Sequence, residues 1–238
     1  MLISTPGIVL QTVKYSDHSL IVKIFTKKNG VVSFIIKNAY SKKSKQPVSF
    51  FAALTILDII YNEPYIEKLS FLKEVHIAHP FHNIYKDIRK NTLFLFYHEL
   101  LTKLLYQATA PDEKLFDFLV ENLLKLENAE TVQPDFHILF LIKLVQQLGY
   151  APQQNFSLQT PYFSIEDSNF SALYVENPYF LSKEASFYLF QILKENNNSI
   201  PDKNTRMELL NGLLQYLMKY NKQIKEIESV RILSEVFS

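Results

Sequence analysis

The spacing of apolar residues changes near His79 and Pro80, and this change constrains the fold more than any other feature of the 238-residue chain. Before it, runs rich in β-branched and aromatic residues alternate with short polar segments, which predicts strands. After it, apolar residues recur every three to four positions, which predicts amphipathic helices. We therefore expect an α+β protein, with residues 1–80 built from strands and residues 81–238 built from helices.

The first 80 residues predict a small β-barrel. Asn29-Gly30 between the second and third runs suits a hairpin turn, because both residues tolerate positive φ angles. An open five-stranded sheet would expose its edges, so we expect closure or near closure into a barrel. The predicted strands cover residues 7–15, 20–25, 31–37, 54–61 and 67–77, with a turn at 62–65.

The rest of the chain predicts a helical domain with one irregular insert. Residues 150–180 lose the helical spacing and contain three prolines. The third helix carries an apolar stripe that we expect in the core, formed by Phe136, Phe140, Leu141, Leu144 and Leu148. The predicted helices cover residues 84–107, 112–126, 135–149, 182–195, 202–220 and 229–237.

Several kinds of chemistry are excluded or disfavoured by the sequence. The chain has no cysteine, which excludes disulfides and thiolate metal sites, and its four glycines are too dispersed for a phosphate-binding loop. His76, His79 and His82 straddle Pro80, so their imidazoles need not converge on a metal. We expect no catalysis, no metal and no cofactor. No apolar run reaches 18 residues and the N-terminus lacks a signal peptide pattern, so we expect a cytoplasmic protein without a membrane span.

Charge is distributed unevenly along the chain. Residues 1–50 contain eight lysines and one acidic residue, a net charge of +7, while the other 188 residues contain 17 basic and 23 acidic groups, a net charge of −6. Such asymmetry suggests a polyanion as the partner of the basic part. The alternative is a solvated basic face without a partner. Four of the lysines lie in residues 35–47, which contain no acidic residue.

The chain resembles the RecO family of bacterial recombination mediators in an ordered set of motifs. These are G-I-V-L-Q-T-V-K-Y at 7–15, S-L-I-V-K-I-F-T at 19–26, K-N-A-Y-S-K-K-S at 37–44 and L-G-Y-A-P at 148–152. The resemblance extends over nearly the whole chain. It implies that residues 1–80 form an OB-fold that binds nucleic acid.

Two departures from the family pattern stand out. The family often has glycine and arginine in the basic loop, where this chain has Asn38 and Tyr40. Many members also carry four zinc-binding cysteines after L-G-Y-A-P. Here Ser157 and Thr160 have about the spacing of the first pair, and hydroxyls do not replace thiolates in structural zinc sites. We expect aromatic packing to stabilise residues 150–180 in place of the metal module.

The resemblance implies a protein without enzymatic activity that binds single- and double-stranded DNA and anneals complementary strands. It also implies that the protein acts with RecR and single-strand-binding protein to help load RecA. The basic residues are expected to contact phosphates and Tyr40 to stack on a base, whereas Phe34 is expected in the core. The predicted DNA-binding residues are Lys14, Lys23, Lys27, Lys28, Lys37, Tyr40, Lys42, Lys43 and Lys45.

Docking residues for protein partners are less well defined by the sequence. A single-strand-binding protein tail is acidic and apolar, so its site should combine a basic residue with an apolar groove. The candidates are Arg89, Lys90 and Arg206. Two other functions remain open. One is a protein-binding scaffold whose basic barrel is incidental, and the other is an enzyme with an unrecognised site.

Overall fold

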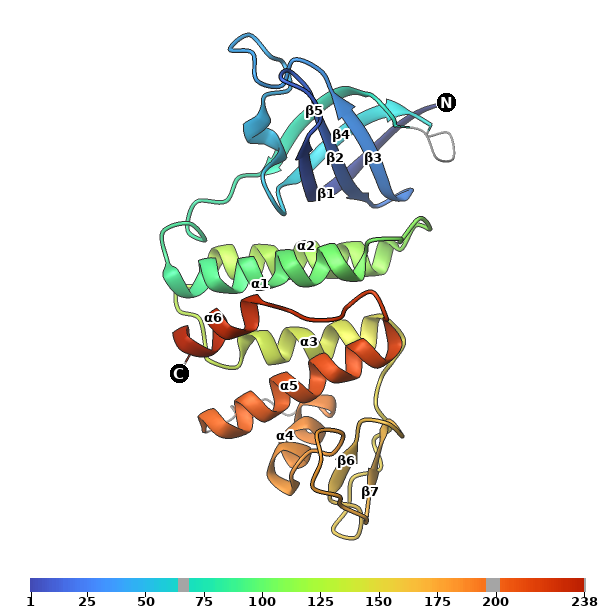
Figure 1. Ribbon diagram of the computed structural model, residues 1–238, viewed down its shortest axis with the longest axis vertical. Helices are drawn as coiled ribbons and strands as arrows, with labels where there is room; N and C mark the ends of the chain where they lie inside the picture. The colour runs from blue at the N-terminus through green and yellow to red at the C-terminus, as the bar shows by residue number, and fades with distance from the viewer. Residues whose placement is uncertain (64–68, 196–201, 238) are drawn as a thin grey trace. The chain divides into compact units, whose positions relative to one another are not determined.

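The structure, a computed structural model, describes residues 1–63, 69–195 and 202–237, which fall into two compact units, Met1–Ala129 and Glu130–Ser238. The first unit contains a five-stranded sheet and helices α1 and α2, and the second contains helices α3 to α6 (Figure 1). The predicted fold class, an N-terminal five-stranded sheet followed by helices, is confirmed.

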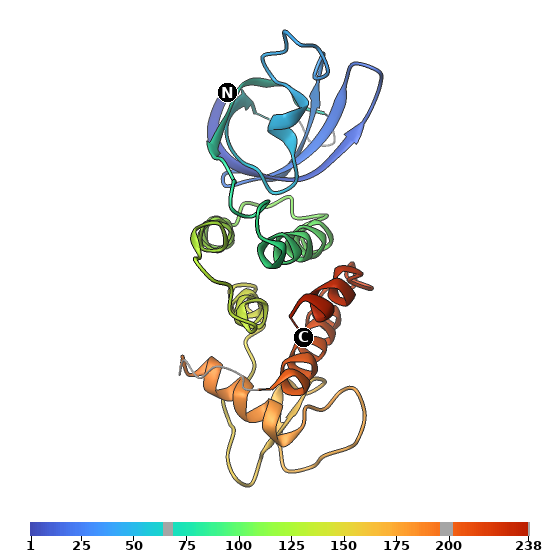
Figure 2. The same ribbon diagram turned by 90° about the vertical axis from the view of Figure 1, so that its left-hand side faces the viewer.

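The five strands are antiparallel and have the order β3-β2-β1-β4-β5. The sheet curls strongly, as the view along it in Figure 2 shows, but it does not close. A single isolated bridge between Phe34 and Ser70 joins β3 to the segment before β5. The strands are β1 (Leu2–Lys14), β2 (Leu20–Thr26), β3 (Gly30–Ile36), β4 (Ile56–Asn62) and β5 (Leu72–His79). The predicted turn at 62–65 and the predicted start of the fifth strand at 67 extend outside the described residues.

The inner face of the curled sheet forms the core of the barrel. Side chains alternate between the two faces of a strand, so every second apolar residue points inward. Phe34 is fully buried, as expected, and packs edge-on against Tyr61 with 5.0 Å between ring centroids. A short 3-10 helix, η1 (Val48–Phe51), adds Phe51 to this core. Other buried members are Val9, Val22, Ile24, Ile36, Leu57 and Ile59.

Helices α1 (Ile88–Leu104) and α2 (Glu113–Asn128) lie side by side against part of the outer face of the sheet (Figures 1 and 2). Phe25 of β2 contacts Phe116 of α2 with 5.8 Å between ring centroids. His98 Nε2 lies 2.9 Å from the Leu10 carbonyl oxygen, which also accepts a hydrogen bond from the Thr102 hydroxyl. The barrel and these two helices therefore share one packed unit.

The β2–β3 turn fits closely against the loop between α1 and α2. The Val31 N–H donates to the Ala108 carbonyl oxygen at 2.7 Å. Gly30 has a φ of 63°, and a Cβ at this position would collide with the carbonyl oxygens of Ala108 and Ala110. Glycine is thus required here for its backbone conformation and for space. Asn29, expected to share the positive φ angles, does not adopt one.

Carboxylate caps set the first residue of several helices. Asp87 accepts from the N–H groups of Arg89 and Lys90, so α1 begins at Ile88, one turn later than the apolar spacing predicted. Asp112 caps α2 through Leu115 N, so α2 begins at Glu113, one residue after the predicted start.

The second unit packs α3 (Phe136–Gln147) and α4 (Lys183–Leu193) with α5 (Lys203–Tyr220) and α6 (Ser229–Val236). On the predicted stripe of α3, Phe140, Leu141 and Leu144 are buried, whereas Phe136 and Leu148 are half-buried. Gly149 follows with a φ of 79°, which ends the helix as expected. Among the described residues, no helix is long and apolar enough to cross a membrane.

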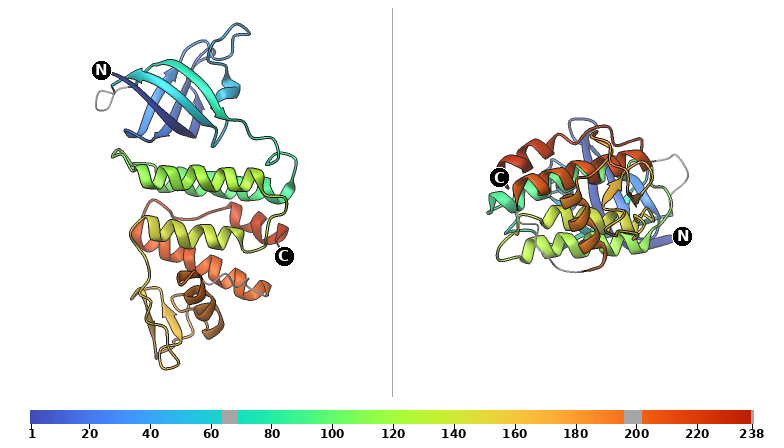
Figure 3. Two further views of the ribbon diagram at one scale, coloured as in Figure 1. Left: turned by 180° about the vertical axis from the view of Figure 1, so that it is seen from behind. Right: turned by 90° about the horizontal axis from the view of Figure 1, so that it is seen from below.

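The insert at 150–180 contains a hairpin that the sequence did not predict. Strands β6 (Tyr162–Ser164) and β7 (Asn169–Ser171) lie beside α4, as Figure 3 shows from behind. Phe156 stacks on Phe190 with 5.0 Å between centroids and meets Phe170 edge-on at 5.5 Å. The Asn155 side chain bonds the backbone N–H and carbonyl of Phe170. Aromatic packing supports the insert, as expected.

Candidate nucleic-acid interface

The lysine loop, residues 37–47, connects β3 to η1 and lies at the top of Figure 1. Two turns give it a defined shape, because Ser41 N donates to Asn38 O and Ser44 N donates to Ser41 O, both at 3.0 Å. The Gln46 amide then ties the loop to the Leu72 carbonyl oxygen at 3.1 Å. The loop therefore has a defined conformation in which Ala39 is buried and the four lysines are exposed.

The lysine loop presents unpaired positive charge. Lys42, Lys43 and Lys45 are exposed, and no described residue lies within ion-pairing or hydrogen-bonding distance of their ammonium groups. Tyr40 is 45 % exposed between them and Lys37. The loop thus combines cations available for an anionic ligand with one accessible aromatic ring.

The turn between β1 and β2 lies at the same end of the barrel. Ala39 N in the lysine loop donates to the His18 carbonyl oxygen at 3.0 Å. Lys14 is also at this end, but its ammonium pairs with Asp17 at 3.1 Å, and both side chains are exposed. Because an exposed pair of this kind is weak, Lys14 can exchange Asp17 for another anion.

Lys27 and Lys28 lie at the opposite end, in the β2–β3 turn, so they do not join the lysine loop. Lys27 Nζ donates to both carboxylate oxygens of Asp117 on α2, at 2.8 and 2.7 Å. Lys28 Nζ donates to the Ser4 carbonyl oxygen at 2.8 Å. Both ammonium groups are engaged within the fold, and we leave them out of the candidate interface.

Two further lysines lie over aromatic rings that the sequence analysis missed. Lys23 Nζ is 4.0 Å from the centre of the Tyr106 ring, and Lys37 Nζ is 5.1 Å from that of Phe71. Both distances are within the range of cation–π attraction. No local sequence signal reveals these pairs, because their members are far apart in the chain.

The residues suggested for partner docking occupy three different environments. Arg89 is exposed in the first turn of α1. The structure corrects the prediction for Lys90, because this residue is 4 % exposed and its Nζ donates to the Glu127 carbonyl oxygen at 2.8 Å. A lysine held in this way is not available to a partner. Arg206 lies on α5 in the second unit.

Glu127 fastens the segment after β5 to the end of α2. Its carboxylate accepts from the backbone N–H groups of His82 and Asn83 at 2.8 Å and of Ile84 at 2.9 Å. Burial alone would raise the pKa of this carboxyl, but these three hydrogen bonds and the charge of Lys90 together lower the pKa. The ionised form of Glu127 is therefore part of the fold.

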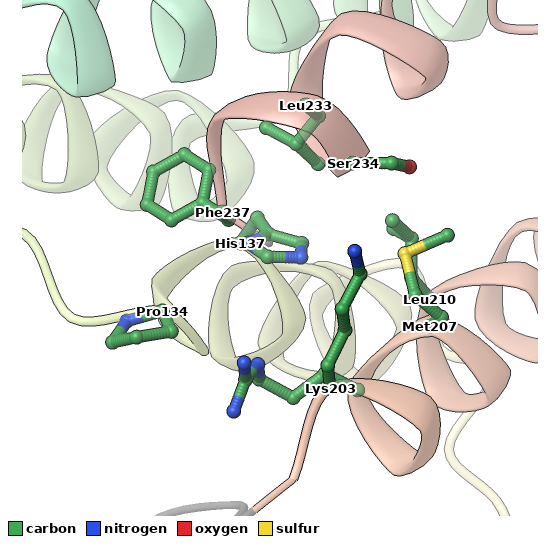
Figure 4. Close-up of a pocket in the computed structure, with 9 residues that line it drawn as sticks. Pro134, His137, Lys203, Met207, Leu210, Leu233, Ser234 and Phe237 are labelled. Carbon is green, nitrogen blue, oxygen red and sulfur yellow. The ribbon is translucent and has the colours of Figure 1, made fainter.

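Arg206 lines a pocket between α3, α5 and α6 (Figure 4). Lys203 adds a second cation, and Leu210 and Phe237 contribute apolar walls. Burial and, second, the nearby charge of Arg206 lower the pKa of His137 to about 3, so its imidazole is neutral at pH 7. The pocket therefore combines cationic and apolar groups.

Two family models match this chain. The family model described as Recombination protein O N terminal matches residues 1–81, and that described as Recombination protein O C terminal matches residues 85–220. The chain belongs to the RecO family. The DNA repair protein RecO of Flavobacterium psychrophilum is 32% identical, and that of Flavobacterium johnsoniae is 30% identical, each over the full length of both chains.

The zinc module that many RecO proteins carry does not fit this chain. At the spacing of the first cysteine pair, the Ser157 and Thr160 hydroxyls bond each other at 2.9 Å, and Thr160 also donates to Asn155 O at 2.8 Å. These hydroxyls are thus used as hydrogen-bonding groups. Within the described part of the chain, no three histidine, aspartate or glutamate residues gather as a metal site, and this includes His76, His79 and His82.

Proposed function

We propose that this RecO-family chain is a cytoplasmic DNA repair protein that works without catalysis. It binds single- and double-stranded DNA through the lysine loop and anneals complementary strands. With RecR, it helps load RecA onto strands covered by single-strand-binding protein. The observation that carries this proposal is the shaped loop with three exposed lysines that have no anionic neighbour among the described residues.

Binding of phosphates by this loop follows from elementary electrostatics. Each lysine that neutralises a phosphate releases a condensed counterion, which favours the complex and makes it sensitive to salt. A loop whose shape is already fixed by backbone hydrogen bonds loses less conformational entropy when it binds. Tyr40 adds a ring on which an unpaired base stacks.

Annealing requires that two polyanions approach each other. Lysines that contact phosphates reduce the repulsion between the strands, and such contacts carry no base code. Base pairing between the strands then selects the complement. A surface of this kind suits a protein that must handle any sequence.

The pocket at Arg206 supports the proposal of a protein partner. An acidic and apolar tail, such as that of a single-strand-binding protein, would place its carboxylates at Lys203 and Arg206. Its apolar groups would lie outside the pocket, whose volume is about 10 Å³ and whose Leu210 wall is fully buried. His137 stays neutral and competes for no anion.

Salt titration tests the DNA-binding proposal. If Lys37, Lys42, Lys43 and Lys45 neutralise about four phosphates, the logarithm of affinity for a fluorescent single strand should fall against log salt with a slope of about −2.8. Annealing of two complementary strands should be accelerated at low salt and lose this acceleration as salt rises. If the protein binds neither single nor double strands at low salt, the proposal fails and a protein-binding scaffold takes its place.

A further inference from the structure

A groove runs along α5 on the surface of the second unit. One wall is the end of the insert, residues 174–181, and the other is the segment that leads into α6, residues 225–230. The volume of the groove is about 670 Å³. The lining residues of α5 recur at helical spacing, so they form one stripe of the helix. They are Glu208, Asn211, Gly212, Leu214, Gln215 and Met218.

The packing of the second unit sets the shape of this groove. A Cβ at Gly212 of α5 would lie 2.6 Å from Cδ2 of the buried Leu181, so the end of the insert packs directly on the helix. Glu208 fastens the same wall, because its carboxylate accepts hydrogen bonds from the Ser182 N–H and hydroxyl groups. An occupant therefore finds a preformed groove and does not have to order it.

Apolar side chains of the groove remain accessible to an occupant. Tyr174 is exposed on the insert wall, while Met218 of α5 and Val230 of α6 are half-buried. Leu173 and Val175, on either side of Tyr174, are also exposed and extend the apolar surface beyond the rim. An occupant with apolar groups would remove this surface from water, which favours binding.

The charge of the groove is negative. Among the described residues that line it, the carboxylates of Glu176, Glu208 and Glu226 stand against one ammonium group, that of Lys225. Glu176 is exposed, and its carboxylate pairs with no described residue. Such a groove repels phosphates and acidic tails and attracts ammonium or guanidinium groups. Its charge is thus opposite to that of the lysine loop.

The length of the groove suits an extended peptide. Glu208 and Met218 are ten residues apart on α5, which is about 15 Å along the helix axis. An extended chain rises about 3.3 Å per residue, so about five residues would cover this length. Between them, Gln215 Oε1 is buried and accepts no hydrogen bond from a described residue. The torsion of a terminal amide is broad, so a small rotation would turn this oxygen toward a donor in the groove.

We propose that this groove binds an extended segment of a protein partner in which arginine or lysine lies between apolar residues. The cation of the segment pairs with Glu176, and its apolar side chains pack against Met218 and Val230. The inference goes beyond the proposed function, because it requires no DNA. It gives the second unit a partner whose charge is opposite to that of the ligands of the lysine loop.

A fluorescent peptide with blocked ends, L-R-F-K-L, tests the charge of the groove by anisotropy with the full chain. It should bind about tenfold more tightly than L-E-F-E-L, which has the opposite charge. Glu176→Lys should weaken binding of L-R-F-K-L about tenfold. Glu130→Lys is the matched control, because Glu130 is exposed in a loop of the same unit and does not line the groove. It should bind within about twofold of the parent.

The apolar part of the groove has a test of its own. The peptide S-R-S-K-S keeps both charges of L-R-F-K-L but should bind about tenfold more weakly, because it buries no apolar side chain. Met218→Ser should weaken binding of L-R-F-K-L about fivefold for the same reason. Met207→Ser is the control, because Met207 is a half-buried residue of the same helix outside the groove. Melting temperatures of all variants verify folding.

The possible results separate this inference from other occupants and from the proposed function. Equal binding of L-R-F-K-L and S-R-S-K-S, or unchanged binding in Glu176→Lys, overturns it. A parent protein that forms an oligomer which Glu176→Lys dissociates also overturns it, because a second copy would then occupy the groove. Glu176→Lys should bind DNA like the parent, and the lysine loop variant should bind the peptide like the parent. Failure of DNA binding therefore leaves this inference intact.

Discussion

The two ends of the barrel carry lysines in opposite situations. At one end, Lys42, Lys43 and Lys45 extend from the lysine loop without an anionic neighbour in the described structure. At the other end, Lys27 is bound by Asp117 and Lys28 by the Ser4 carbonyl oxygen. Both sets arise from the same basic stretch of sequence.

The difference shows that the number of lysines in a segment does not determine whether each ammonium group is bound within the fold or is available to a ligand. An ammonium group that already has a fixed carboxylate or carbonyl partner must give it up before it can bind a phosphate. One that is exposed to water gives up only hydration and counterions. We therefore expect the lysine loop to bind DNA and the β2–β3 turn to stabilise the first unit.

The largest expected effect comes from removing the loop charges. Changing Lys42, Lys43 and Lys45 together to alanine should flatten the salt slope for single strands by about 2 units, which corresponds to about 100-fold weaker binding at 0.1 M salt if the affinities meet near 1 M. All sequences should be affected alike. Fluorescence anisotropy at several salt concentrations measures both quantities.

The matched control carries Lys27→Ala and Lys28→Ala at the other end. Its salt slope should stay within about 0.5 of the parent, because these lysines do not contact phosphates in our proposal. If this control loses as much slope as the loop variant, the comparison between the two ends is wrong.

A smaller effect is expected from the loop tyrosine. Tyr40→Ala should weaken single-strand binding about tenfold with little change in salt slope, because stacking releases no counterions. Tyr40→Phe, which keeps the ring, should bind like the parent. A slope change in Tyr40→Ala equal to one lysine would show that the residue acts by positioning a charge.

Glu127 extends the comparison, because it is an ionised group that stabilises the fold through hydrogen bonds to backbone N–H groups. Its lowered pKa in the folded protein means that its contribution to stability is present above its ordinary pKa of 4.5 and is lost as pH falls through the folded-state value. Glu127→Gln should lower the free energy of unfolding by about 1 kcal/mol at pH 7. Thermal melts from pH 7 to pH 3 should show this difference shrinking, and a difference that grows at low pH would contradict the assignment.

The smallest effect is expected for the ion pair at the β2–β3 turn. A double-mutant cycle with Lys27→Ala and Asp117→Ala should give a coupling energy of about 0.5 kcal/mol, because the side chains are 29% and 60% exposed and water screens them. Urea unfolding measures the four stabilities. A coupling of zero would place Lys27 with the loop lysines as a group without a firm partner.

Much of the fold could be predicted because its signals are local. The β-branched runs and the Asn29-Gly30 turn act on their immediate neighbours, and the strands they predict are present. The exposure of the lysine loop was equally readable, since a polar segment between two apolar strands has no core face. The hairpin of β6 and β7 was not predicted, because strands of three residues are too short to show an alternation of apolar and polar residues.

The binding partners and the burial of individual lysines could not be predicted from the sequence. Asp117 lies 90 residues from Lys27, and Glu127 lies 37 residues from Lys90, so both partners are brought near only by the fold. Lysine is rarely buried, so nothing in the sequence indicated that Lys90, a candidate for partner docking, would be only 4 % exposed. The contacts of Tyr106 with Lys23 and of Phe71 with Lys37 were also missed, because the members of each pair are far apart in the sequence.

The close fit of Gly30 against the α1–α2 loop bears on how this protein should be divided for experiments. A fragment that stops at residue 81, where the first family model ends, would strip α1 and α2 from the barrel and leave Ile8 and Phe25 uncovered. Such an apolar face invites aggregation. A fragment that runs to residue 129 keeps the cover and the Glu127 contacts, so it is the piece we expect to express well and to report faithfully on the lysine loop.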